Sequence, residues 1–265
     1  MKTRIPLIDF ANITVIKGRN QKVLDSISLQ IAEGENVAIL GPNGAGKSSL
    51  IKLITRQYYP VPDDQSSFRI WGQENWDVFD LRYLLGIVSN DLQYQCNRDI
   101  TGMEVVLSGF FSSIGLFKEH ITPLMRQKAQ EIIDFLEIDH LKERTIDYMS
   151  SGEARRFLIG RALVHDPKAL ILDEPTNSLD LHALYKFTNI LQKIVKRGTS
   201  IILVTHYLSD IIPEINRVIL MKDGGFYKDG PKGEVLTGSH LSKLFEAPIE
   251  ITSKDGYYYA LRGKT

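Results

Sequence analysis

The apolar residues of this chain follow two spacings, which divide it into strand-like and helix-like stretches. Short runs rich in β-branched residues, partly alternating with polar ones, predict strands, and apolar residues at three- and four-residue intervals predict helices. The expected strands are 7–16, 23–31, 36–40, 68–72, 86–89, 169–173 and 200–205, and the expected helices are 50–55, 76–84, 103–111, 125–138, 154–165, 181–195 and 240–246.

The order of these stretches indicates an α/β fold. The first strands predict an N-terminal antiparallel β subdomain, and the later alternation of strands and helices is typical of a mostly parallel core sheet. Helices follow one another without a strand in the middle of the chain. We therefore expect one domain over 1–265, with a helical subdomain at about 92–165 inserted in the α/β core and a short C-terminal extension at about 232–265.

Composition narrows the class of protein. Hydrophobic residues make up 43% and charged residues 24% of the chain, as in an ordinary soluble globular protein. Basic and acidic residues balance at 32 each, so we expect no nucleic-acid partner. Cys96 is the only cysteine, which excludes an intramolecular disulfide and a cysteine zinc cluster. Because no window approaches the roughly 18 apolar residues of a membrane helix, a role at a membrane requires a separate protein.

A glycine-rich loop between an expected strand and an expected helix matches the pattern G-x-x-x-x-G-K-[ST]. Glycines let successive backbone N–H groups point inward, and the following helix N-terminus attracts phosphate. Lys47 adds a charge for the β- and γ-phosphates, and the Ser48 hydroxyl can bind Mg²⁺. The loop predicts a nucleoside triphosphate site made by Gly41, Pro42, Asn43, Gly44, Ala45, Gly46, Lys47, Ser48 and Ser49.

Hydrolysis also needs an acid that organises Mg²⁺ and a group that activates water. The apolar strand 169–173 ends in two adjacent carboxylates, at the edge of an open sheet where ligands bind. Asp173 is expected to support Mg²⁺. Glu174 is expected to act as the general base or to position the attacking water.

Taken together, these motifs resemble those of the ATP-binding cassette (ABC) ATPases over nearly the whole chain. Residues 149–153, MSSGE, resemble the family's signature LSGGQ, and their continuation to Pro167 is equally similar. Ser178, Leu179 and Asp180 resemble the D-loop. His206, after the strand 200–205, occupies the place of the family's switch histidine, and with Glu174 and Lys47 completes the expected catalytic set.

The resemblance implies two composite ATP sites between two cassettes. Ser150, Ser151, Gly152 and Glu153 lie at the start of an expected helix, whose N-terminus attracts anionic phosphate. In the family this end faces the nucleotide of the opposing cassette. The chain contains one cassette, so the resemblance implies a homodimer that binds ATP and Mg²⁺.

The chain departs from the family pattern at two places. Where the family carries an aromatic residue that stacks on adenine, this chain has Ile16 and Lys17, and we assign Lys17 to the nucleotide site. Where the family has a glutamine that touches Mg²⁺ and the membrane partner, Asn90 and Gln93 are both candidates. We favour Gln93, because Asn90 is one methylene shorter.

Residues 105–117 and the C-terminal segment resemble those of cassettes in metal-chelate importers for siderophores, haem or cobalamin, and of a related stand-alone branch. This implies an ATPase on the cytoplasmic face of the membrane that powers separate transmembrane permease subunits. Two alternatives remain: a soluble ABC ATPase that acts on a non-membrane partner, and a nucleotide-binding module with little turnover.

The missing aromatic residue predicts a weak preference for the base. GTP should compete with ATP more effectively here than in a cassette with a stacking tyrosine. Competition binding with the two nucleotides tests this expectation. Strong selectivity for ATP that is lost on changing another residue would place the adenine contact elsewhere.

Overall fold

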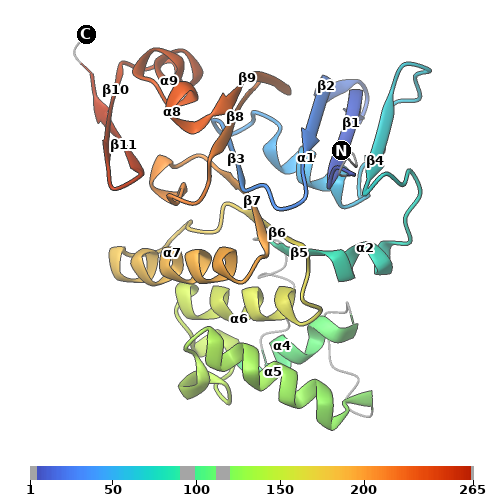
Figure 1. Cartoon of the computed structure of the whole chain (residues 1–265), viewed down its shortest axis with the longest axis vertical. Helices are drawn as coiled ribbons and strands as arrows, with labels where there is room; N and C mark the ends of the chain where they lie inside the picture. Colours follow the sequence, from blue (N-terminus) through green and yellow to red (C-terminus); the bar gives the residue numbers. More distant parts are fainter. Residues whose placement is uncertain (1–4, 90–98, 112–119, 264–265) are drawn as a thin grey trace. The chain divides into compact units, whose positions relative to one another are not determined.

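The computed structural model describes residues 5–89, 99–111 and 120–263 (Figure 1). The chain forms two compact units. One contains Met1–Val78 together with Ser200–Thr265, and the other contains Phe79–Thr199.

An antiparallel sheet begins the first unit, in the strand order β2-β1-β4. Buried residues of β1 change from even positions, such as Phe10, to odd positions, such as Ile13, because the register shifts between these two residues. Asn12 lies inside this bulge with a φ of 50°. A bulge moves every following side chain to the other face, which explains the partial alternation in the sequence. The strands are β1 (Ile8–Lys17), β2 (Gln21–Ile31) and β4 (Ser67–Ile70).

Parallel strands form the core of the same unit. β3 pairs in parallel with β7 on one side and with β8 on the other, and β9 pairs antiparallel with β8. Every residue of β3 and β7 is buried, as expected for parallel strands covered on both faces. The bounds are β3 (Val37–Leu40), β7 (Ser200–Thr205), β8 (Arg217–Lys222) and β9 (Gly225–Pro231), and α1 (Lys47–Ile54) follows β3.

A buried lysine, Lys232, connects parts of the C-terminal segment of this unit by hydrogen bonds. The Lys232 ammonium donates hydrogen bonds to the carbonyl oxygens of Pro213 and Gly256, both at 3.1 Å, and so ties the last hairpin to the segment after β7. Burial lowers the pKa of this ammonium. The elements are η5 (Leu208–Asp210), α8 (Lys232–Val235), α9 (Gly238–Phe245), β10 (Ile249–Lys254) and β11 (Tyr257–Arg262).

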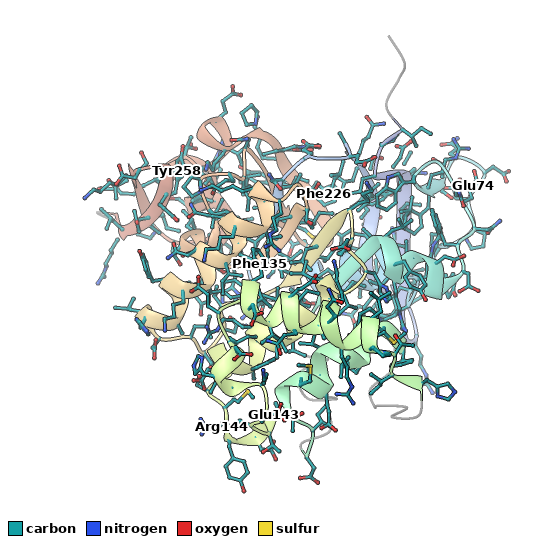
Figure 2. The ribbon with its side chains drawn as sticks, turned by 60° about the horizontal axis from the view of Figure 1, so that its bottom comes forward. Glu74, Phe135, Glu143, Arg144, Phe226 and Tyr258 are labelled. Atoms are coloured by element: carbon teal, nitrogen blue, oxygen red, sulfur yellow. The ribbon has the colours of Figure 1, made fainter. Side chains whose placement is uncertain are left out.

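In the second unit, α6 lies between α7 and the pair α4 and α5 (Figure 1). Helices approach α6 closely at Gly160, where an added Cβ would lie 3.0 Å from Val106 and 3.2 Å from Leu136. At the end of α5, the Phe135 ring, labelled in Figure 2, lies 3.4 Å from the Arg197 guanidinium. The helices are α2 (Val78–Leu84), α4 (Gly102–Ser108), α5 (Pro123–Phe135), α6 (Ser151–Leu163) and α7 (Leu181–Lys196), with short 3₁₀ turns η1 (Gly109–Phe111), η3 (Asp139–Leu141) and η4 (Ile146–Tyr148).

A pair of parallel strands completes the second unit. β5 (Leu85–Val88) pairs in parallel with β6 (Ala169–Asp173), and Ala169 to Leu172 are all buried. The expected mostly parallel α/β fold with a separate antiparallel β sheet is therefore confirmed.

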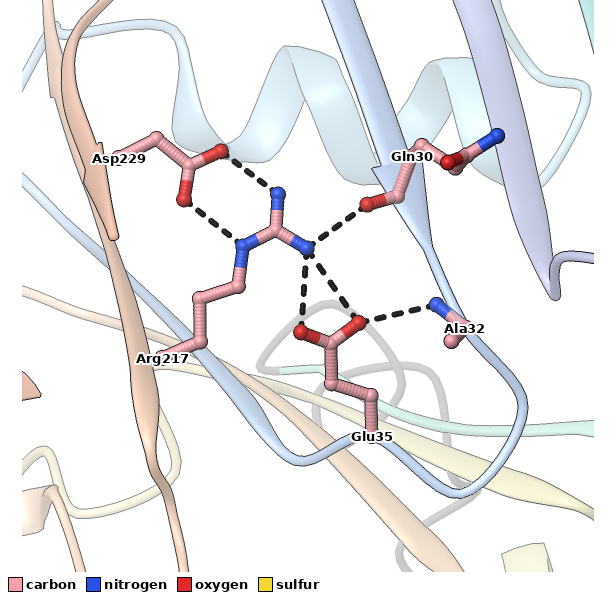
Figure 3. Close-up of polar contacts among 5 residues, drawn as sticks. All are labelled: Gln30, Ala32, Glu35, Arg217 and Asp229. Atoms are coloured by element: carbon pink, nitrogen blue, oxygen red, sulfur yellow. Dashed lines mark hydrogen bonds and ion pairs between the residues drawn. The ribbon is translucent and has the colours of Figure 1, made fainter. Parts of the chain in front are cut away.

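Arg217 joins three strand ends in the first unit (Figure 3). Its guanidinium donates to both carboxylate oxygens of Asp229, at 2.8 and 2.6 Å, to the Gln30 carbonyl oxygen at 2.8 Å, and to Glu35 at 3.1 Å. The Asp229 contacts, followed by those of Glu35, raise the pKa of Arg217 although burial opposes this. A planar guanidinium suits this fork of acceptors, whereas an ammonium does not.

We predict that Arg217→Lys lowers the free energy of unfolding by about 1–3 kcal/mol, because the charge stays but the two-pronged contact is lost. Equilibrium urea denaturation measures the change. Arg69→Lys is the matched control, because within the described part of the chain the Arg69 side chain bonds only the exposed Glu74. Its effect should stay within about 0.5 kcal/mol. If both variants lowered the free energy of unfolding by the same amount, the proposed importance of the two-pronged Arg217 contact would be contradicted.

Candidate active site

The glycine loop follows β3 and turns directly into α1. Gly44 and Gly46 have φ values of 83° and 101°, in the left-handed region that favours glycine. Gly46 is the N-cap of α1 and offers no side-chain acceptor, so a bound phosphate group can satisfy the amides of the first turn. The backbone of the glycine loop and the uncapped start of α1 therefore have the conformation that the phosphate-binding motif requires.

Lys47 lies against this loop. Its side chain is buried, and its ammonium donates to the carbonyl oxygens of Gly41 at 2.8 Å and Pro42 at 2.9 Å. These bonds place the positive charge at the centre of the loop. The cation that a phosphate group needs is therefore already in place before the phosphate binds, which lowers the entropic cost of binding.

Two glycines of the loop are required by close backbone packing. A Cβ on Gly41 would lie 2.3 Å from the Met221 carbonyl oxygen, and one on Gly46 would lie 2.7 Å from the Val23 carbonyl oxygen. Both distances are far shorter than any real contact. The strands β2 and β8 therefore fix the shape of the loop from outside.

The end of β7 lies beside the start of the loop. The Gly41 amide donates to the Thr205 carbonyl oxygen at 3.3 Å, and His206 is the next residue along the chain. The Thr205 hydroxyl bonds the buried Asp210 and accepts a hydrogen bond from the Tyr207 amide at 3.0 Å, which fixes the turn on which His206 stands. The first unit thus brings His206 next to the phosphate loop. The Tyr207 ring lies 3.9 Å from the His206 ring.

In the second unit, the two expected carboxylates stand at the end of β6. Glu174 has a φ of 46°, an uncommon conformation for a residue other than glycine and one that is concentrated at functional sites. Its Oε2 accepts a hydrogen bond from the Asn177 side-chain amide at 2.9 Å, and its carbonyl oxygen accepts one from the Arg155 guanidinium, also at 2.9 Å. Arg155 is only 4% exposed. Both the backbone and the carboxylate of Glu174 are therefore positioned by other side chains.

The signature segment begins α6. Ser150 caps the helix by accepting a hydrogen bond from the Glu153 amide, and Glu153 bonds the Ser150 amide in return at 2.8 Å. The Ser150 backbone contact, followed by its hydroxyl, lowers the pKa of Glu153 although burial opposes this, so the carboxylate stays charged. The motif is therefore a capping box, with a negative side chain in the first helical turn.

The signature and the D-loop touch within this unit. The Ser151 hydroxyl donates to the Ser178 carbonyl oxygen at 3.0 Å, and a Cβ on Gly152 would lie 3.0 Å from Ala183. Ser178 has a φ of 66°, and Asp180 caps α7 through the Ala183 amide at 2.7 Å. The two motifs, 27 residues apart in sequence, form one surface.

Two sets of expected residues are thus each brought together, one in each unit. The first unit unites residues 41–49 with His206. The second unites Asp173 and Glu174 with the signature and the D-loop. Lys17 lies exposed at the end of β1, next to Ile16, which is 40% exposed. Asn90 and Gln93 lie outside the described residues.

Sequence reasoning missed two positioning residues, Arg155 and Asn177. Arg155 lies in the second turn of α6 directly before Arg156, and nothing in the sequence distinguishes it from this neighbour. Asn177 lies between the acid pair and the D-loop and has no distinctive pattern of its own.

The residues expected to bind Mg²⁺ are oxygen donors. No cluster of three or more His, Cys, Asp or Glu side chains that could hold a metal ion occurs in the part of the chain that the structure describes. This donor set suits Mg²⁺ all the same, because the ion keeps several waters and takes only one or two protein oxygens in addition to substrate phosphates. Ser48 is exposed on the first turn of α1, and Asp173 is half-buried at the end of β6.

Gly46→Ala should abolish nucleotide binding, because the new Cβ meets the Val23 carbonyl and the backbone at φ 101° must move. Gly34→Ala is the matched control. Gly34 also has a positive φ, 86°, but a Cβ there meets nothing within 4 Å. It should cost about 1–2 kcal/mol of stability and leave nucleotide affinity unchanged. Calorimetric titration with ATP distinguishes the variants, and full ATP affinity in Gly46→Ala would refute the packing argument.

Comparison with known proteins agrees with this geometry. The family model described as ABC transporter matches residues 24–177. The uncharacterized ABC transporter ATP-binding protein YlmA of Bacillus subtilis is 33% identical, over 89% of this chain and 90% of its own length. The hemin import ATP-binding protein HmuV of Bradyrhizobium diazoefficiens is 29% identical, over 91% of this chain and 89% of its own length.

A solved ATP-binding cassette of an ABC transporter, in its ADP conformation, has the same fold. Its TM-score is 0.76 and its identity 23%, over 91% of this chain and 97% of that one. The match to the family model covers more than half of this chain, and the resemblance expected from the motifs is confirmed. The chain therefore belongs to the ABC transporter ATP-binding family and is one of its ATPases.

Proposed function

We propose that this chain is the ATP-hydrolysing subunit of a membrane transporter and works as a pair of identical cassettes. The observation that supports the proposal most strongly is the way in which the side chain and the backbone of Glu174 are both held in place. Its carboxylate is oriented by Asn177, and its backbone is held by the buried Arg155. A charged side chain on a strained turn, supported from two sides, is what a positioned general base requires.

ATP binding is the work of the first unit. The amides of the loop and the first turn of α1 bind the phosphate oxygens, and the Lys47 ammonium exchanges its carbonyl partners for the β- and γ-phosphates. Ser48 and Asp173 would hold Mg²⁺. When bound, this ion neutralises charge that develops on the phosphates.

Hydrolysis follows when water attacks the γ-phosphorus and ADP leaves. The Glu174 carboxylate orients this water and accepts its proton. Phosphoryl transfer depends mainly on positioning and on charge stabilisation, so the hydrogen bond from Asn177 contributes by holding the base in one orientation. His206, fixed by the Thr205 turn, is assigned to the γ-phosphate end of the nucleotide, as the family resemblance implies.

A second copy of the chain completes each site. The N-terminal end of α6, with Ser150, Ser151 and Gly152, is assigned to the nucleotide of the opposing cassette. The hydrogen bond from Ser151 to Ser178 then makes the signature and the D-loop respond together. ATP would thus act as the contact between the two copies.

The partner is a separate transmembrane permease. No helix among residues 5–89, 99–111 and 120–263 is long and apolar enough to cross a membrane. We place the cassette on the cytoplasmic face, and we propose a metal chelate as the cargo class. The sequence segments 105–117 and 234–261 support this choice, and so does the relative that imports hemin.

Glu174→Gln should trap an ATP-bound dimer. The neutral amide keeps the shape of the side chain but is a poor base, so turnover should fall by roughly 10²–10⁴-fold. Nucleotide binding should survive, because the phosphate loop is unchanged. Size-exclusion chromatography with ATP and Mg²⁺ should then show a dimer that is absent without nucleotide.

The control is the double variant Glu174→Gln with Ser151→Arg, in which the arginine blocks the signature surface and should prevent the dimer. A dimer that forms without nucleotide, or wild-type hydrolysis by Glu174→Gln, would exclude the proposed mechanism.

A further inference from the structure

A small basic hollow lies in the helical part of the second unit, and its lining contains none of the residues assigned to catalysis. Its volume is about 320 Å³, and α6, α7 and the residues after α5 line it. Four of its lining side chains are cations and one is a carboxylate. These are Arg156, Lys186, Lys193, Lys196 and Glu137.

The lining of this hollow has an excess of positive charge that a larger hollow in the same unit lacks. A larger one in the same unit, of about 760 Å³, has as many carboxylates as cations in its lining. The whole chain is also balanced, with 32 basic and 32 acidic residues. The basic hollow therefore concentrates charge that neither the composition nor the neighbouring surface shares.

Arg156 contributes the guanidinium group of this hollow. Its side chain is only 9% exposed. Among the residues that the structure describes, its guanidinium forms no hydrogen bond, and its nitrogen atoms are not among the fully buried unpaired ones, so they stay open to solvent. Burial lowers the pKa of Arg156, which reflects the cost of keeping this charge away from water. A charge that is partly removed from water is stabilised by a hydrogen-bonded counter-charge, which this guanidinium can obtain from a ligand.

The two carboxylates that influence Arg156 are already engaged elsewhere. Glu153 bonds the amide and hydroxyl of Ser150 in the capping box. Glu137 forms an ion pair with Lys193. In this structure, neither gives the guanidinium the two-oxygen contact that satisfies its planar fork.

The lysines of α7 lie where they can contact the same ligand. Lys186, Lys193 and Lys196 are separated by seven and three residues, so they share one face of the helix. Within the described residues, Lys186 and Lys196 make no hydrogen bond or ion pair. Their flexible ammonium groups are therefore available to contact an anion that is bound by the Arg156 guanidinium.

We infer that this hollow binds a phosphate-bearing anion. A guanidinium matches two phosphate oxygens, and lysine ammonium groups add point charges around the remaining ones. The volume suits a single phosphate group with a small substituent. Such a group is present both in soluble phosphate compounds and in the headgroups of anionic phospholipids, and the two sources are separated by experiment.

Isothermal titration calorimetry with inorganic phosphate tests the inference on the full chain. Saturating ADP occupies the phosphate loop beforehand, so that a further binding event reports another site. We expect saturable binding of one phosphate per chain that weakens as salt is added. In the double variant Lys186→Gln and Lys196→Gln, affinity should fall roughly tenfold.

These lysines suit the test because they are exposed and make no contact that folding needs. The matched control is Arg126→Gln with Lys254→Gln, which removes the same charge from exposed positions outside the hollow. It should bind phosphate as the unchanged chain does. Arg156→Lys keeps the charge but loses the fork, and it should also bind more weakly.

Co-sedimentation with phosphatidylglycerol vesicles, compared with phosphatidylcholine vesicles, forms the second arm. If only the vesicles bind, and the Lys186 and Lys196 substitutions remove this binding, the anion is a lipid headgroup. If only free phosphate binds in this way, the anion is soluble. The inference is overturned if neither probe binds, or if the lysine variant binds both probes as well as the control does.

Discussion

The hydrogen bond from the buried Arg155 guanidinium to the Glu174 carbonyl oxygen is the constraint on which the proposed hydrolytic part of this protein depends. It ties the second turn of α6 to the residue that follows β6. One end of the same helix carries the signature, and the turn after Glu174 leads into the D-loop. A shift of α6 therefore reaches Glu174 through one short bond, and the contact between Ser151 and Ser178 gives a second route. This arrangement explains how a change at the proposed dimer surface can alter the proposed base.

The phosphate-binding half is governed by a different constraint, the close approach of backbone segments. Gly41 and Gly46 have no space for a side chain, because β8 and β2 press against the loop. Lys47 fills the centre, and the Thr205 carbonyl fixes the loop's first amide. A loop confined in this way keeps its donors in place before ATP arrives, which reduces the cost of ordering them on binding. Side-chain hydrogen bonds thus hold Glu174 in place, whereas close backbone packing holds the glycine loop in place.

Much of the fold and of the candidate site could be predicted from the sequence, because the motifs and the spacing of apolar residues are local features. The glycine loop, the acid pair and the helical spacing are all contained within short windows. The positions of Arg155 and Asn177 could not be predicted, since their partners are fixed by tertiary packing. The shift of burial from Phe10 to Ile13 was also hidden, because a bulge depends on the facing strand. The basic hollow could not be predicted from a chain of zero net charge, because it collects residues from two helices and from the turn after a third.

The central claim is that Glu174 performs its role in the orientation given by Asn177. The turnover number of Asn177→Ala, measured together with its affinity for ATP, tests this claim most directly. The substitution removes one hydrogen bond and leaves both the carboxylate and the phosphate loop intact. We predict that kcat falls roughly tenfold while ATP affinity stays unchanged, as expected when an interaction serves the transition state alone. A kcat equal to that of the unchanged chain would contradict the account.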